Sequence, residues 1–238
     1  FLLYTVDIGG RNMDHSNTIH SFAAVIGDIK DSRHLENRKE VQIRLQRILD
    51  RLNEKYKEDI VSRFLITLGD EFQGLLSSGK YILDMVNEIR MEMYPVRLRF
   101  GIGFGQITTD IRTEMALGAD GPGYYRAREA VELLKEREKK NRSVLSELCL
   151  KMDETHRDKE ILLNTVFDLM YVVESGWTDR QREVIWDMLL HGDGQQNTAG
   201  RLGITQSTVQ KTLAAGSYYT YESALKNASE ILGDIQDD

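Results

Sequence analysis

Two apolar runs of β-strand composition, separated by a glycine and two acids, limit most strongly what this chain can fold into. They occur in Phe64-Leu-Ile-Thr-Leu-Gly-Asp-Glu-Phe-Gln-Gly-Leu-Leu76. A short turn of this kind between two apolar runs is typical of a β-hairpin. A second Gly-Asp pair, Gly27-Asp28, closes the apolar run that begins at Phe22. The sequence therefore predicts two strands whose ends carry carboxylates.

Strand and helix patterns alternate over the first two thirds of the chain. Apolar residues occupy every second position of residues 96–104, which is the period of a strand. We expect strands at residues 21–29, 61–68, 72–76, 96–104 and 144–150, and helices at residues 41–56, 82–89 and 124–140. This order begins with the split βαβ, ferredoxin-like arrangement. The predicted fold class is α+β, with Arg97 and Arg99 on the half-exposed face of their strand.

The predicted fold brings the acidic strand ends together. In a split βαβ sheet the first and third strands are antiparallel neighbours at the centre. Asp28 ends the first strand, and Asp70 and Glu71 open the third. Since Mg²⁺ is commonly held by one or two carboxylates with phosphates and waters, we expect a Mg²⁺ site at these three residues. The alternative is that each Gly-Asp pair forms a turn in which the acid caps backbone N–H groups.

Residues suited to phosphate lie close to these acids. A cationic, hydroxyl-bearing segment follows Asp28, and a glycine-rich segment at residues 118–123 opens a helix whose first N–H groups suit an anion. Ordinary solvated loops are the alternative for both segments. The predicted nucleotide-binding residues are Lys30, Ser32, Arg33, Gly69, Arg126 and Arg128, and no catalytic residue is assigned.

The composition changes after residue 152. A polar link at residues 153–160 precedes a region of helical periodicity. Within it, a helix at residues 198–202, a turn at Gly203 and a helix at residues 206–215 with Thr205 as its N-cap form a helix-turn-helix pattern. Side chains suited to base edges and phosphates are Arg201, Gln206, Ser207, Thr208, Gln210 and Lys211.

The charge of this region weakens the case for DNA. From Trp177 onward there are 5 Lys and Arg against 9 Asp and Glu, so the net charge is 5 minus 9, or −4. DNA binding draws on phosphate neutralisation, so this region alone should bind DNA weakly. The alternative is that the same helices serve dimerisation or protein docking.

Composition limits the remaining possibilities. The net charge of −7 argues against a general polyanion-coating protein. Cys149 is the single cysteine, so no intrachain disulfide forms, and its apolar neighbours predict a core position in a protein of the reducing cytoplasm. No segment approaches the ~20 apolar residues of a membrane span, so no membrane partner is expected. We predict an N-terminal extension at residues 1–20, with Met13 as a candidate start, an α+β domain at residues 21–152 and a helical domain at residues 153–238.

Several motifs carry a family resemblance. Thr67-Leu-Gly-Asp-Glu-Phe72 resembles the signature hairpin of GGDEF-type diguanylate cyclases, and Gly101-Ile-Gly-Phe-Gly105 with Gly-Pro-Gly-Tyr-Tyr-Arg-Ala-Arg128 is similar to class III nucleotide cyclases, both of which have palm-like domains. More closely, the chain from about Ala23 to Leu232 resembles the bacterial SatD family. Its motifs here are residues 27–33, 68–76, 95–103, 116–122 and 202–211.

The resemblance to cyclases has gaps. Leu68 stands where a diguanylate cyclase has its first glycine. Tyr124, Tyr125 and Arg126 occupy the neighbourhood in which class III cyclases place an asparagine and an arginine. The resemblance implies a palm-like domain with a retained metal site, a cyclising apparatus in doubt and a homodimer with sites between head-to-tail subunits.

These observations favour one function over two others. The favoured one is a cytoplasmic, nucleotide-responsive, DNA-binding transcriptional regulator with a Mg²⁺-nucleotide site in its palm-like domain. The second is a metal-dependent nucleotidyl cyclase or transferase, in which the helical region serves assembly. The third is a scaffold with a degenerate, non-catalytic site. Whether the protein is an enzyme stays open on the sequence alone.

Overall fold

The computed structural model describes residues 21–67, 69–109, 111, 113, 120–140 and 146–235. The predicted extension at residues 1–20, Leu68, part of the glycine-rich segment and the start of the strand predicted at residues 144–150 lie outside these ranges. The elements of the described chain follow the predicted order β-α-β-β-α-β-α-β, and helices follow them.

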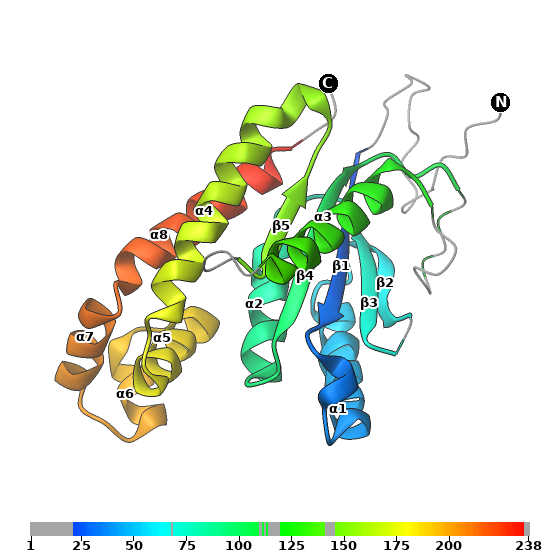
Figure 1. The fold of residues 1–238 in the computed structure, drawn as a ribbon. Coiled ribbons are helices and arrows are strands. Elements are labelled where there is room, and N and C mark those ends of the chain that lie inside the picture. Colours follow the sequence, from blue (N-terminus) through cyan, green and yellow to red (C-terminus); the bar gives the residue numbers. More distant parts are fainter. Residues whose placement is uncertain are drawn as a thin grey trace.

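A five-stranded mixed sheet forms the centre of the N-terminal part (Figure 1). Its spatial order is β2-β3-β1-β4-β5, and β1 runs antiparallel to both β3 and β4, while β5 runs parallel to β4. The first six elements therefore form the expected split βαβ arrangement. The strands are β1 (Phe22–Ile29), β2 (Ile60–Ile66), β3 (Glu71–Leu76), β4 (Leu98–Gly105) and β5 (Leu148–Lys151).

Helices cover both faces of this sheet. Figure 1 shows α3 (Pro122–Lys139) crossing one face, with α1 (Arg38–Lys55) and α2 (Ile82–Met93) behind the other. Alternation along β1 explains the two layers, because successive strand residues point to opposite faces. Val25 packs in the core with α1 and α2, and Ile26 packs with Val131 of α3. The sheet is thus buried on both sides.

This arrangement corrects the expectation that the Arg99 face of β4 is half exposed. Gly101 and Gly103 alternate with the apolar residues of β4 and let the α3 backbone lie against the strand. A Cβ on Gly103 would lie 2.2 Å from the carbonyl oxygen of Gly123 and 2.3 Å from the amide nitrogen of Ala127. Gly101 and Gly103 share the Arg99 face of β4, and they are contact points for α3 rather than exposed positions.

Gly27 is also a packing position and not part of a turn. It lies inside β1, and a Cβ there would lie 2.1 Å from Cζ of Phe72. Phe72 is fully buried and meets Phe100 edge-to-face at a centroid distance of 6.0 Å. The alternative explanation of Gly27-Asp28 as a turn is therefore wrong, and Asp28 lies within a strand.

The C-terminal part is helical. It comprises α4 (Arg157–Ser175), α5 (Asp179–His191), α6 (Gln195–Leu202), α7 (Gln206–Ala215) and α8 (Tyr218–Gly233). A second apolar core is centred on Val184, Val209 and Leu213 of α5 and α7. We call α5–α7 the helical unit.

Two long helices contribute to both cores. In α4, Phe167 belongs to the core of the sheet and Val173 packs against that of the helical unit. In α8, Leu232 belongs to the first and Tyr221 to the second. The division of the chain at residue 152 stays a prediction. Among the described residues, no helix is long and apolar enough to cross a membrane.

Candidate functional site

The register of β1 fixes where the acidic residues lie. Asp28 pairs with Glu71 of β3 on one side and with Arg99 of β4 on the other. The amide of Ile29 donates to the carbonyl of Asp70 at 2.9 Å and holds the turn before β3 against the end of β1. Residues opposite each other in paired strands share one face of the sheet. The prediction that these acids meet at one end of the sheet is confirmed.

Two cations neutralise the carboxylate of Asp28. Its Oδ2 accepts a hydrogen bond from Nη1 of Arg99 at 2.6 Å, and its Oδ1 lies 3.3 Å from Nζ of Lys135 on α3. Burial lowers the pKa of Lys135, but the charges of Asp28 and Glu132 outweigh it and the pKa is raised. Asp28 is 7% exposed, and a carboxylate at that depth requires such partners.

Glu71 is held by one bidentate ion pair. Arg128 of α3 donates from Nη1 and Nη2 to the two carboxylate oxygens, each at 2.9 Å. The side chain of Glu71 is 9% exposed and that of Arg128 is 50% exposed, so the guanidinium covers the carboxylate on the solvent side. The hydrogen bond to Glu71 raises the pKa of Arg128. Arg128 therefore competes with any cation that approaches Glu71.

Asp70 has a different environment. Its Oδ2 accepts a hydrogen bond from the Ser32 hydroxyl at 2.5 Å, and no cationic side chain pairs with it in the part of the chain that the structure describes. Ser32 is buried in a short 3₁₀ turn (Ser32–His34) after β1, whereas Arg33 of the same turn is exposed. Gly69 adopts φ of 67°, and its carbonyl accepts a hydrogen bond from Gln42 of α1. This side of the site keeps an accessible carboxylate.

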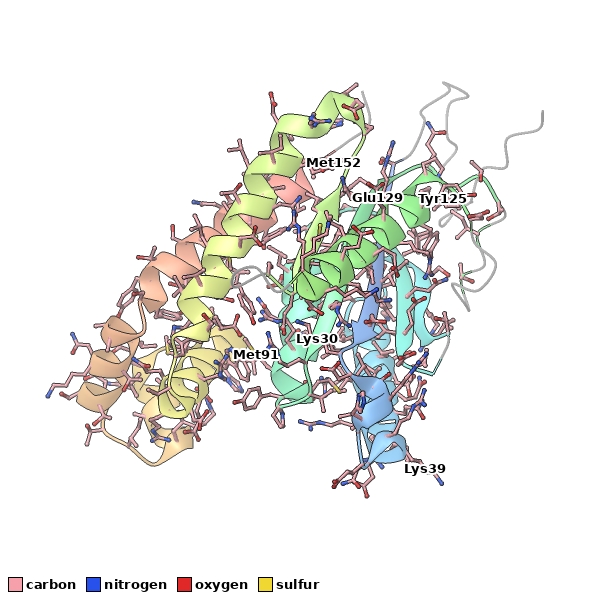
Figure 2. The ribbon with its side chains drawn as sticks, viewed as in Figure 1. Lys30, Lys39, Met91, Tyr125, Glu129 and Met152 are labelled. Carbon is pink, nitrogen blue, oxygen red and sulfur yellow. The ribbon has the colours of Figure 1, made fainter. Side chains whose placement is uncertain are left out.

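Lys30 connects the site to α3 and β5. Its Nζ lies 2.5 Å from Oε1 of Glu138 and 3.5 Å from Oε1 of Glu147. Figure 2 shows Lys30 beside the C-terminal half of α3. Burial opposes ionisation of Glu138, but hydrogen bonds from Arg99 and Lys30 outweigh it and lower the pKa of this carboxyl. Lys30 is therefore already paired with acids of the chain.

Arg126 lies at the other end of the sheet. It donates from Nη1 to the carbonyl of Phe104 at 2.5 Å, and Phe104 pairs with Ala23 at the start of β1. Of the predicted nucleotide-binding residues, the structure thus gathers Lys30, Ser32, Arg33, Gly69 and Arg128 near the acids, and separates Arg126 from them.

The side chains at this end of the sheet include oxygen ligands of the type that Mg²⁺ prefers, but not all of these oxygens are free to bind an ion. Carboxylate oxygens are hard ligands, yet those of Asp28 and Glu71 are engaged by cations. No group of three or more His, Cys, Asp or Glu arranged to hold a metal occurs in the described ranges. Asp70 with the Ser32 hydroxyl fits a Mg²⁺ ion that arrives with phosphate ligands, which needs one or two carboxylates. The residues do not fit a preformed two-metal centre.

Ion pairs continue from the acids towards the helical unit. Glu147 accepts a hydrogen bond from Nε of Arg97 at 2.5 Å and lies 3.5 Å from Nε of Arg90. Glu174 of α4 accepts hydrogen bonds from Arg90 at 2.8 Å and from Arg182 of α5 at 3.1 Å. We call the whole series the ion-pair chain. It runs through Asp28, Arg99, Glu138, Lys30, Glu147, Arg90, Glu174 and Arg182.

Most of the predicted DNA contacts are exposed on one helix. Thr205 caps α7 by accepting a hydrogen bond from the amide of Thr208 at 3.1 Å, as predicted. Val209 and Leu213 bury the opposite side of the helix. The exposed residues are Gln206, Ser207, Thr208, Gln210 and Lys211.

Arg201 has a different position from these residues. Its guanidinium donates to both carboxylate oxygens of Asp187 on α5 and to both of Asp193 in the loop before α6. Hydrogen bonds to Asp193 and Asp187 raise the pKa of Arg201. Arg201 therefore ties α6 to α5 in this structure.

Sequence reasoning missed the α3 side of the site. Lys135 and Glu138 contact Asp28 and Arg99 from α3, and neither was among the candidates. The signal was present in the spacing, because Arg128, Lys135 and Glu138 share a helical face with the buried Val131. Charged residues interrupting an apolar helix face could have indicated buried ion pairs with the sheet.

The fold and its acidic sheet end define a class of protein: an α+β protein with a split βαβ sheet, followed by a bundle of helices. The model of the SatD family matches residues 22–232, and the chain belongs to this family. The comparison with curated proteins gives no match.

Solved structures provide three distant similarities. A bacterial light-regulated adenylyl cyclase is 15% identical, with 55% of this chain and 74% of the other covered at a TM-score of 0.39. The catalytic core of a rhodopsin-guanylyl cyclase with converted specificity, in complex with ATPαS, is 14% identical, with 50% and 74% covered at a TM-score of 0.34. A regulator of polyketide synthase expression from Bifidobacterium adolescentis is 12% identical, with 90% and 85% covered at a TM-score of 0.28. At these values the similarities carry no argument about activity.

Proposed function

We propose that this protein is a cytoplasmic regulator that binds a nucleotide at the acidic end of its sheet and DNA through its helical unit. One observation carries the first half: Asp70 accepts a hydrogen bond from Ser32 at the end of the sheet where Arg128 pairs with Glu71 and where Lys30 and Arg33 follow β1. Hydroxyl and cationic groups suit phosphate oxygens, and the accessible carboxylate suits the Mg²⁺ that accompanies them. In this proposal Asp70 holds the ion and Lys30, Ser32 and Arg33 contact the phosphates.

Because Asp28 and Glu71 are already paired with cations, we propose that the protein senses the nucleotide and does not convert it. Arg99, Lys135 and Arg128 already neutralise Asp28 and Glu71. Mg²⁺ supplies charge stabilisation at phosphorus when it is bound, and catalysis with two such ions needs carboxylates free to hold both. A ligand that draws Lys30 or Arg99 away from its acid would instead disturb the ion-pair chain, which ends at the helical unit. The proposed response to the nucleotide is this redistribution of ion pairs.

The second half of the proposal concerns DNA. In α6 and α7 we infer a helix-turn-helix, with the left-handed Gly203 (φ 62°) between them and α7 as the recognition helix. Its exposed amides, hydroxyls and Lys211 suit base edges and phosphates. Because Arg201 is held by two aspartates, we assign it a structural role in this proposal. A homodimer would add a second α7, which offsets the weak electrostatics of one copy.

Thermal unfolding with Mg²⁺ and ATP or GTP tests the nucleotide site. A ligand at 100 times its Kd adds about 2.7 kcal/mol to the free energy of unfolding. We expect at least one nucleotide to raise the melting temperature of the wild type and of Asp50→Asn, an exposed control on α1. Asp70→Asn should abolish the rise. The absence of any rise, or an equal rise in Asp70→Asn, would reject the nucleotide site and favour a scaffold.

Chromatography of the incubated nucleotide separates regulator from enzyme. Intact nucleotide together with a change in affinity for DNA supports the regulator. Consumption of the nucleotide by the wild type and not by Asp70→Asn would establish the alternative, a nucleotidyl cyclase or transferase, which the acids on neighbouring strands β1 and β3 favour.

DNA binding is tested with genomic DNA fragments over a series of salt concentrations. Lys211→Gln should weaken binding and reduce the magnitude of the salt slope by about 1, the expected effect of one lost phosphate contact. Lys226→Gln on α8 removes the same charge from an exposed side chain and serves as the control. Equal effects of the two variants would show that α7 is not the DNA-binding element.

A further inference from the structure

A cleft of about 350 Å³ lies between the sheet-containing part and the helical region. Sites for small molecules typically measure about 300–1,000 Å³. The loop from α2 to β4 provides one wall, and the C-terminal half of α4 with α5 provides the other. Its lining includes Tyr94, Arg97, Glu147, Glu174, Arg182 and Trp186.

An aromatic corner forms one side of the cleft. The rings of Tyr94 and Trp186 meet edge-to-face, with centroids 5.3 Å apart and an interplanar angle of 83°. The guanidinium of Arg182 lies 5.4 Å and 5.1 Å from these two ring centroids. Tyr94 is 43% exposed, so part of its ring faces solvent. Rigid aromatic surfaces of this kind favour planar ligands.

The charges of the lining leave a surplus of one positive charge. Arg90, Arg97 and Arg182 carry three, and Glu147 and Glu174 carry two of opposite sign. Arg90 and Arg182 both bind Glu174, and both are largely buried, with side chains 16% exposed. Their charges are therefore committed to the interface.

Arg97 is the cation that faces the cleft. Its side chain is 52% exposed. Nε donates to Glu147 and Nη2 to the hydroxyl of Tyr171, while Nη1 has no hydrogen-bond partner within the described part of the chain. These two contacts hold the guanidinium in place and leave one edge for an acceptor from outside. Charge-assisted hydrogen bonds of this type are among the stronger ones.

We propose that this cleft binds a small planar aromatic molecule with a single negative charge. The ring packs against Tyr94 and Trp186, and the anionic group accepts a hydrogen bond from Nη1 of Arg97. None of Asp28, Asp70 and Glu71 lines this cleft, so its ligand does not use the acids proposed for Mg²⁺, although Glu147 of the lining also lies 3.5 Å from Nζ of Lys30. The several charges of a nucleoside triphosphate also exceed its surplus of one.

The position of the cleft gives such a ligand a second effect. Arg97 belongs to the segment that leads into β4, whereas Trp186 belongs to α5. A ligand that contacts both joins the sheet to the helical unit. Its binding therefore favours the arrangement in which these two parts are packed together.

Fluorescence polarisation of 2-naphthoate, with the full-length protein, tests the site. We expect saturable binding, and at least tenfold weaker binding of the neutral 2-naphthamide in competition. Arg97→Gln should weaken 2-naphthoate binding at least tenfold. Arg180→Gln removes the same charge from an exposed position of α5 outside the cleft and should bind as the wild type does.

A second variant covers the case in which Arg97→Gln unfolds. Val96→Glu keeps Arg97 and its partners but adds a carboxylate to the lining, and it should also weaken binding at least tenfold. The proposal is overturned if millimolar 2-naphthoate does not bind, if the amide binds equally well, or if folded Arg97→Gln and Val96→Glu bind like the wild type.

Discussion

Asp28 contributes more to the stability of the folded protein than an exposed acid in the same sequence motif would. Arg99 and Lys135 converge on its carboxylate at 7% exposure, so removing its charge takes the buried anion from both cations and leaves them only Glu138 and Glu132, respectively. Breaking a buried ion pair in this way typically costs about 3–5 kcal/mol. We expect Asp28→Asn to lower the free energy of unfolding by about 3 kcal/mol, measured by urea denaturation.

Glu132 provides the matched control for Asp28. It pairs with the same Lys135 but lies on the exposed side of α3, with a side chain 57% exposed. Glu132→Gln should change the free energy of unfolding by less than about 1 kcal/mol, as is usual for exposed pairs. A similar loss in both variants would contradict the buried network around Asp28.

Cys149 makes a simple test of the core. The thiol is fully buried beside Ala130 and Leu134, and burial raises its pKa to about 11. It should therefore be protonated and unreactive towards a thiol reagent at pH 8 in the native protein. In guanidinium chloride one equivalent should react rapidly. Fast labelling of the native protein would show that β5 and α3 open readily.

The surroundings of Asp28 could be predicted only in part from the sequence. The pairing of Asp28 with the Asp70-Glu71 turn followed from strand order alone, because strand order sets which ends meet. The partners Lys135 and Arg128 did not follow, since the rotation and distance of α3 relative to the sheet depend on side-chain packing. The acids could be predicted, whereas their neutralisation could not.

Among the contacts between elements, the one between β4 and α3 leaves almost no room for a side chain on the strand. The backbone of α3 lies so close that a methyl group on Gly103 meets it at 2.2 Å. Overpacking of this kind costs about 1–3 kcal/mol and more where backbone must move. We expect Gly103→Ala to lower the free energy of unfolding by about 3 kcal/mol in urea denaturation.

Gly200 gives the opposite expectation for the same substitution. It lies inside α6, and a Cβ there meets no atom within 4 Å. Since alanine is better than glycine in a helix by about 1 kcal/mol, Gly200→Ala should stabilise the protein by up to that amount. If both alanine variants were destabilising to the same extent, the close approach of α3 to β4 would not be the cause.

Helices and strands were predicted more accurately than their surroundings. The predicted range 206–215 agrees with α7, because an N-cap threonine and a following glycine mark its ends. The strand predicted at residues 96–104 formed with shifted bounds, as β4 (Leu98–Gly105), but its Arg99 face was expected to be half exposed and is covered by α3. The periodicity of a strand shows which of its faces is apolar. A glycine on the other face does not indicate whether that face is exposed or covered by a helix.

For the whole molecule, the carboxylates with lowered pKa set the response to acid. The pKa of Glu138 is lowered, and that of Asp153 falls from 3.8 to about 2 because hydrogen bonds from Thr155 and His156 outweigh its burial. A carboxyl with a lower pKa in the folded state stabilises fully above its unfolded pKa, which is near 4. This stabilisation is lost as the pH falls from about 4 towards 2.

Urea denaturation across this pH range checks the effect. The free energy of unfolding of the wild type should decline below about pH 4. Glu138→Gln and Asp153→Asn should each have a shallower decline and a lower starting value near pH 6. A slope unchanged in both variants would assign the acid sensitivity to other carboxyls.

Glu174 connects the two cores of the molecule. It is 5% exposed and binds Arg90 of α2, Arg182 of α5 and the hydroxyl of Tyr221 on α8. Glu174→Gln leaves the two arginines without their shared anion, so the packing of the helical unit against α2 should weaken. We expect the thermal transition to broaden or divide in calorimetry, whereas Glu183→Gln, on the exposed side of α5, should keep a single transition.

Two long helices, α4 before the helical unit and α8 after it, connect this unit to the rest of the molecule. Since α4 and α8 pack on each other and both are anchored in the core of the sheet, α5–α7 is mounted at two points. A body held by one linker swivels, but a body held by two braced supports moves mainly by tilting with both. A movement of α4 and α8 relative to the sheet would therefore change the orientation of α7 with them.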